Sequence, residues 1–110
     1  MITRTAIFEG HIKPGHEQKF YDDIERRLAP LWVKFPHALA VRWCRVQSSD
    51  EGSPPIALIQ QVDYPSLEAL EAAMASPERA AARAMTQEIL SAFEGRFYHV
   101  VSEGHIVQGS

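Results

Sequence analysis

The stretch FEGHIKPGHEQKFYDDIERRLAPLW, residues 8–32, joins the end of a strand to an amphipathic helix. Pro14 and Gly15 are turn-forming residues and separate the two elements. After the turn, apolar side chains recur at spacings of three and four, the period of a helix with one buried face. They are Phe20, Ile24, Leu28, Leu31, Trp32 and Phe35. Pro30 predicts a kink or break within this helix, because proline lacks a backbone donor and clashes with the preceding turn.

Three further segments alternate apolar and polar side chains, which is the two-residue period of a strand. They are residues 2–12, 38–47 and 56–64. The stretch SSDEGSPP, residues 48–55, is rich in turn-forming residues. It predicts a hairpin loop between the last two of these strands.

A second helical region follows the third strand. Ser66 is a suitable N-cap for it, because a serine hydroxyl can accept from a free backbone N–H of the first turn. Ser76 can cap a restart of the helix, with Pro77 at the first helical position. We expect this helix to end at Gly95 and residues 96–106 to form the last strand.

The order β-α-β-β-α-β predicts an α+β, ferredoxin-like fold with a four-stranded antiparallel sheet. Right-handed crossovers place both helices on one face of that sheet. The other face carries apolar side chains such as Ile7, Cys44 and Ile59, and an exposed patch of this kind usually marks an interaction site. Because a two-fold interface presents the same patch on both subunits, we expect a homodimer whose sheets meet face to face.

Length and composition predict one soluble globular domain spanning residues 1–110. Fourteen acidic and eleven basic side chains give a net charge of −3, which argues against nucleic acid as a partner. Cys44 is the only cysteine, so no internal disulfide can form and a cysteine-based zinc site is excluded. No run approaches the roughly 18 apolar residues of a membrane span, and no signal peptide is evident. We expect a cytoplasmic protein.

The segments KPGHEQKF, PLWVKFPHA and ASPERAAARAMTQEILSAFEGRFYHVVSE carry a family resemblance that covers nearly the whole chain. The chain resembles the dimeric α/β-barrel superfamily and, within it, the EthD-like proteins. The resemblance implies a subunit whose sheet joins that of its twin in an eight-stranded barrel. Relatives include cofactor-independent monooxygenases, lactone isomerases, polyketide cyclases and haem-degrading enzymes. A shared fold does not transfer chemistry, so the function must be argued from the site.

Two histidines lie at strand ends that this topology brings together. His11 ends the first strand and His99 lies near the start of the last, and the two face each other if paired residue numbers sum to about 110. Histidine suits proton transfer near neutral pH, and a carboxylate such as Glu9 can orient it. We hypothesise that His11 and His99 are catalytic, with Glu9 as the orienting group. Alternatively, both are half-buried sheet residues bonded to the backbone or across the dimer.

Aromatic and polar side chains could complete a substrate pocket around these histidines. Trp32, Tyr64 and Tyr98 are candidate apolar walls, although Trp32 could instead anchor the end of the first helix. Arg42 and Gln61 lie on the strand face opposite to Tyr64. If that face is the interior of a barrel, they require partners, such as a bound anion or a residue of the other subunit.

A metal site is not expected. The chain has neither an HxxxH pair on a helix nor a motif of two histidines and a carboxylate. The first functional hypothesis is a small enzyme without a bound cofactor that oxygenates, isomerises or cyclises a small hydrophobic carbonyl or aromatic compound. The second is a non-catalytic homodimer that binds a small ligand or assists a neighbouring enzyme.

Overall fold

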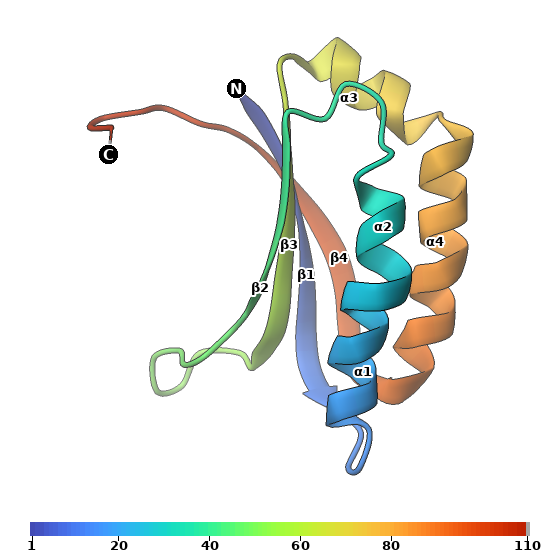
Figure 1. Ribbon diagram of the computed structural model, residues 1–110. Helices are drawn as coiled ribbons and strands as arrows, with labels where there is room; N and C mark the ends of the chain where they lie inside the picture. The colour runs from blue at the N-terminus through green and yellow to red at the C-terminus, as the bar shows by residue number, and fades with distance from the viewer. Residues whose placement is uncertain (110) are drawn as a thin grey trace.

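The computed structural model describes residues 1–109. In chain order its elements are β1 (Ile2–Ile12), α1 (Glu17–Asp23), the π-helix η1 (Ile24–Leu28), α2 (Ala29–Trp32), β2 (Ala40–Arg45), β3 (Ile56–Tyr64), α3 (Leu67–Met74), α4 (Pro77–Ile89), the 3-10 helix η2 (Leu90–Ala92) and β4 (Phe93–Glu103). The four strands form one antiparallel sheet in the order β2-β3-β1-β4. The helices cover one face of this sheet (Figure 1). The predicted ferredoxin-like α+β fold is confirmed.

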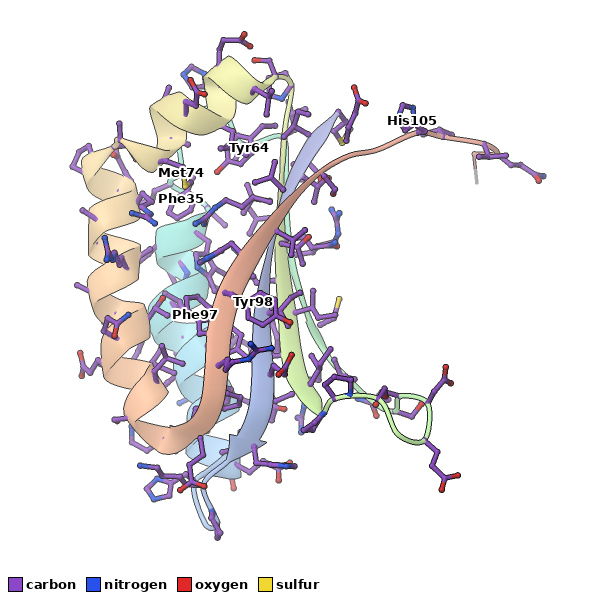
Figure 2. All side chains as sticks on the ribbon, turned by 180° about the vertical axis from the view of Figure 1, so that it is seen from behind. Phe35, Tyr64, Met74, Phe97, Tyr98 and His105 are labelled. Atoms are coloured by element: carbon purple, nitrogen blue, oxygen red, sulfur yellow. The ribbon has the colours of Figure 1, made fainter. Side chains whose placement is uncertain are left out.

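The pairing of β1 with β4 determines which side chains face the helices. Ala6 and Phe8 are buried, and they lie opposite His99 and Phe97. Because partners in register share a face, His99 and Phe97 also point toward the helix layer. Tyr98 lies between them in β4 and therefore points toward the face without helices (Figure 2).

Phe8 lies at the centre of an aromatic cluster that joins the sheet to the first helix. Its ring centroid lies 6.0 Å from Phe20 of α1, 5.9 Å from Phe93 and 4.7 Å from Phe97. The rings of Phe20 and Phe93 meet the ring of Phe8 edge to face, which is an arrangement that aromatic pairs prefer. This cluster fixes the position of β4 against the helix layer.

The predicted disturbance at Pro30 takes the form of a π turn. Residues Ile24–Leu28 form the π-helix, and the backbone N–H of Ala29 donates to the carbonyl oxygen of Ile24. Proline cannot donate to the turn before it, and its ring needs space there. The wider π turn accommodates the ring and lets the helix continue to Trp32.

The two predicted serine caps are confirmed. Ser66 Oγ accepts from the backbone N–H of Ala69 at 3.1 Å, and Ser76 Oγ accepts from that of Arg79 at 3.2 Å. Pro77 occupies the first position of α4. Each cap satisfies one of the backbone donors that a helix start leaves free.

The predicted end of the last helix at Gly95 is wrong. The helix ends at Ile89, and β4 begins at Phe93. Gly95 instead lies in β4 directly opposite Gly10, with φ values of 147° and 144° for the two residues. A Cβ atom on Gly10 would lie 2.8 Å from the Cα of Gly95 and would overlap the carbonyl oxygen of Glu94. Only glycine fits at either position of this pair.

The face of the sheet without helices carries an apolar belt with one side chain from each strand. Successive cross-strand partners in this row are Cys44, Ile59, Ile7 and Tyr98. On one side of the belt the next row is Arg42, Gln61, Thr5 and Val100, and Glu9 and Arg96 lie on its other side. This face is therefore amphipathic rather than uniformly apolar. Separately, no helix within residues 1–109 is long and apolar enough to cross a membrane.

Candidate functional site

A cleft of about 290 Å³ lies between α4 and the helix-facing sides of β1 and β4. Its lining combines cationic, aromatic and small polar side chains: Arg4, Phe35, Arg79, Ala82, Arg83, Thr86, Gln87, Phe97 and His99. Phe35 and Phe97 provide apolar walls (Figure 2). The volume suits a small ligand built on one or two rings.

His99 is the titratable base of this cleft. Its ring packs edge-on against Phe97, with the centroids 4.8 Å apart. Burial, together with the positive charges of Arg4 and Arg79, lowers the pKa of His99 to about 4. The imidazole is therefore neutral at pH 7 and can accept a proton or a hydrogen bond.

The arginines of the cleft carry positive charge without acidic partners. Within residues 1–109, Arg4, Arg79 and Arg83 form no ion pair, and the lining residues include no carboxylate. Burial and the charge of Arg79 lower the pKa of Arg4. Elsewhere, four arginines do pair with acids: Arg27, Arg42, Arg45 and Arg96. The cleft is thus a positive site in a protein whose net charge is −3.

Tyr64 lies on the same face of the sheet as the cleft. Its hydroxyl is buried and finds no hydrogen-bond partner within residues 1–109. Burial raises the pKa of Tyr64, and the charge of Arg4 acts in the opposite direction. The phenol therefore stays protonated at neutral pH, within the electrostatic influence of Arg4.

We expect Tyr64→Phe to raise the free energy of unfolding by about 1 kcal/mol, because the change removes an unpaired buried hydroxyl and keeps the ring. Tyr98→Phe is the matched control. It removes a hydroxyl that donates to Glu9 at 3.0 Å and should lower the free energy of unfolding. Urea denaturation at one protein concentration measures both variants. A loss of stability in Tyr64→Phe would show that the hydroxyl has a partner in solution.

The predicted facing pair of histidines is wrong. His11 lies opposite Glu94, and His99 lies opposite Ala6. The register differs from the predicted one by an odd number of residues, so the two histidines occupy opposite faces of the sheet. β4 spans Phe93–Glu103 rather than residues 96–106, and its Phe93 pairs with Ile12 of β1, so paired residue numbers sum to 105 instead of about 110.

Glu9 contacts neither histidine through a hydrogen bond in the described part of the chain. Its carboxylate accepts from the guanidinium of Arg96 at 3.1 Å and from the hydroxyl of Tyr98 at 3.0 Å. All three side chains lie on the face without helices. Tyr98 is therefore separated from the cleft by the sheet, although its neighbours in sequence line that cleft.

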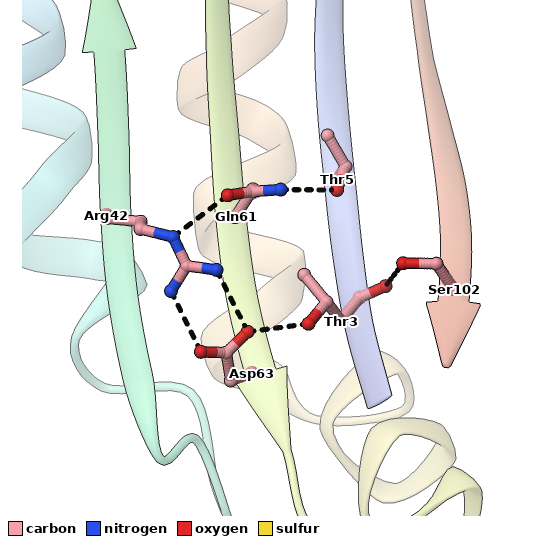
Figure 3. A network of polar contacts seen from close by, with 6 residues as sticks. All are labelled: Thr3, Thr5, Arg42, Gln61, Asp63 and Ser102. Carbon is pink, nitrogen blue, oxygen red and sulfur yellow. Dashed lines mark hydrogen bonds and ion pairs between the residues drawn. The ribbon is translucent and has the colours of Figure 1, made fainter. Parts of the chain in front are cut away.

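Arg42 and Gln61 belong to a polar network on the same helix-free face (Figure 3). The guanidinium of Arg42 donates to Asp63 at 2.8 Å and to Gln61 at 2.9 Å. Gln61 in turn donates to Thr5, and the hydroxyl of Thr3 donates to Asp63 at 2.7 Å. The hydrogen bond from Arg42 lowers the pKa of Asp63, which is a carboxylate at neutral pH. Arg42 thus has its partners within one subunit.

Trp32 is buried in the hydrophobic core and does not line the cleft. The site residues that the sequence analysis did not identify are the three arginines of the cleft. A signal was present, since Arg79 and Arg83 are four residues apart on one helix face without an acid at a matching position. Among residues 1–109, no three histidine, cysteine, aspartate or glutamate side chains lie close enough together to hold one metal ion.

Comparisons with known proteins identify the fold. No protein-family model matches the chain, and no curated protein matches it. An ethyl tert-butyl ether D (EthD) family protein from Bacillus halodurans is 22% identical, with a TM-score of 0.74 over 96% of this chain and 99% of that chain. A hydroxynitrile lyase from Passiflora edulis is 17% identical, with a TM-score of 0.68 over 98% and 97%. A dimeric ferredoxin-like protein of unknown function from Bacteroides fragilis is 12% identical, with a TM-score of 0.65 over 94% and 95%.

Proposed function

We propose that this protein is a small enzyme whose general base is His99 and whose substrate is a small carbonyl or aromatic compound. The observation that carries the proposal is a half-buried, neutral imidazole in the wall of a ring-sized cleft. Proton removal next to a carbonyl or phenol group can begin an oxygenation, an isomerisation or a cyclisation. A base that is unprotonated at the working pH is the group that such a step requires.

The fold comparisons support an enzyme of this general kind. The hydroxynitrile lyase from Passiflora edulis shares the fold over nearly the full length of both chains. The fold is therefore compatible with chemistry on a small molecule. At 17% identity the comparison supports the fold alone, so the residues of the proposed site are argued from this chain.

We further propose that two copies associate through the face without helices. The apolar belt of Cys44, Ile59, Ile7 and Tyr98 would be buried against the same belt of a second copy. The dimeric protein from Bacteroides fragilis with the same fold supports this assembly. The network around Arg42 and Asp63 would then lie at the interface with its hydrogen bonds already satisfied.

A test of the base does not require the natural substrate. 5-Nitrobenzisoxazole fits the proposed site because it is a flat aromatic molecule. A base removes the proton on the carbon next to the isoxazole nitrogen, that carbon and the nitrogen become a nitrile as the N–O bond breaks, and a coloured cyanophenolate forms. We expect the protein to accelerate this reaction about 100-fold over buffer and His99→Gln to lose most of the effect. From about pH 5.5 to 8 the rate should be constant, because a base of pKa about 4 is already unprotonated.

His16→Gln is the control, because His16 is exposed just before α1 and does not line the cleft. His11→Gln compares the two histidines singled out from the sequence and should retain the activity. A rate that rises with a midpoint near pH 6.5 would point to an ordinary exposed histidine instead. Equal rates for the wild-type protein and His99→Gln would contradict the proposal and favour a cleft that only binds.

A further inference from the structure

We propose that the cleft takes an aromatic carboxylate, with the anionic group held by Arg4, Arg79 and Arg83. The ring of this ligand would lie between Phe35 and Phe97. This inference rests on the proposed function, because it assigns a substrate class to the same cleft. Three observations carry it: the charge of the lining, the position of the arginines, and their effect on His99.

The charge of the lining is one-sided. All three ionised groups that line the cleft at neutral pH are arginines, and within residues 1–109 none of them meets an acid. Acidic residues outnumber basic ones in the chain as a whole, so the lack of acidic partners in the cleft does not reflect a shortage of acidic residues. Arg4 and Arg79 are partly removed from water, whereas Arg83 is exposed. A partly buried cation without a counter-ion reduces stability. An anionic ligand would offset that cost.

The positions of the arginines are unfavourable for folding. Arg79 lies in the first turn of α4, where the helix dipole disfavours a positive charge. Arg83 lies one turn further on the same helix face, and like charges at this spacing repel each other. Arg4 enters the same cleft from β1, and its pKa is lowered by burial and by Arg79. Such a convergence contributes nothing to the stability of the free protein, whereas guanidinium groups match a carboxylate in geometry and charge.

The arginines also act on the proposed base. In the free protein, Arg4 and Arg79 contribute to the low pKa of His99, so its basicity is weak. A bound carboxylate would neutralise part of this positive potential and raise the pKa of His99 toward its ordinary value. The base would then become stronger only when a substrate of the correct charge occupies the cleft.

Benzoate and benzamide separate the contribution of charge from that of shape, because the two molecules have the same ring and nearly the same size. Binding at pH 7 can be followed by chemical-shift changes of the backbone amides of α4 and β4. We expect benzoate to bind at least tenfold more tightly than benzamide, and more tightly than acetate. Arg79→Gln should weaken benzoate about tenfold and leave benzamide unchanged. Benzoate should also raise the pKa of His99 in an NMR titration.

Arg26→Gln is the matched control. Arg26 is exposed in η1, forms no ion pair within residues 1–109, and does not line the cleft. The substitution Arg26→Gln removes the same unit of charge as Arg79→Gln and should leave the affinity for benzoate unchanged. Arg83→Gln provides a second cleft variant if Arg79→Gln disturbs the start of α4.

The outcomes distinguish failure of this inference from failure of the proposed function. Benzamide binding as tightly as benzoate would overturn the acidic substrate class and leave the cleft as a ligand site. Acetate binding as tightly as benzoate would reduce the site to one for simple anions and overturn the aromatic part. Equal losses of benzoate affinity in Arg79→Gln and Arg26→Gln would show that net charge, and not the cleft, determines binding. No binding of any of the three molecules would contradict the proposed function itself.

Discussion

Gly95→Ala is expected to lower the free energy of unfolding by about 3 kcal/mol, because it combines backbone strain with steric overlap. The backbone at Gly95 has a φ of 147°, which side chains rarely adopt. In addition, a methyl group there would overlap the carbonyl oxygen of Glu9 in the neighbouring strand. Main-chain atoms of the central strand β1 and the edge strand β4 cannot move apart here without breaking the β1–β4 pairing. Gly10→Ala should have a similar effect, because the contact is reciprocal.

Gly52→Ala is the control that separates backbone strain from steric overlap. Gly52 also has a positive φ, 85°, but a methyl group there would meet no atom within 4 Å. We therefore expect a cost of only about 1 kcal/mol. Urea denaturation of the three variants at one protein concentration provides the comparison. If Gly95→Ala cost no more than Gly52→Ala, the close approach of β1 and β4 would be wrong.

Ile59→Lys is expected to convert the protein from a dimer to a monomer. Ile59 lies in the apolar belt, with Ile7 and Cys44 as its cross-strand partners. A lysine there would place two unpaired charges in the proposed interface, one from each copy. Burying an unpaired charge costs several kcal/mol, so the dissociation constant should rise at least about 1,000-fold. Sedimentation velocity at micromolar concentration would then give a single chain of 12.4 kDa instead of a particle of twice that mass.

Leu67→Lys is the control for this change. Leu67 is 52% exposed at the start of α3, in the helix layer and away from the belt. The substitution Leu67→Lys introduces the same charge as Ile59→Lys at an exposed apolar position and should leave the dimer intact. Circular dichroism would establish that both variants are folded. If Ile59→Lys remained a dimer, the interface would lie elsewhere on the surface. If the wild-type protein were a monomer, the proposed association of two sheets would be wrong.

Much of the fold could be predicted from local patterns. The alternation of apolar residues located β1 and β3, and the chemistry of serine and proline located the starts of α3 and α4. These features depend on neighbours within a few residues, which the sequence shows directly. The end of the last helix could not be predicted in the same way. Gly95 has the character of a helix terminator, but its role depends on Gly10, which is 85 residues away in the chain.

The candidate site was predictable only in part, for a related reason. His99 was singled out for its chemistry, but its face depends on the register that the early start of β4 sets. The arginines of α4 resemble the solvated charges of an ordinary surface helix. That they line one cleft with Arg4 depends on how α4 is placed over the sheet, which no spacing in the sequence encodes. The partner of Arg42 was missed because Asp63 becomes its neighbour only through the pairing of β2 with β3.

The alternation of β4 has a consequence for how this protein can change over evolutionary time. Phe97 and His99 line the cleft, whereas Tyr98 between them belongs to the belt on the reverse side of the sheet. Under the proposed function and the proposed dimer, consecutive residues of β4 therefore meet separate requirements, one chemical and one for self-association. If both proposals hold, selection can alter the preferred substrate at positions 97 and 99 while preserving the contact between copies at position 98, and the reverse is equally possible.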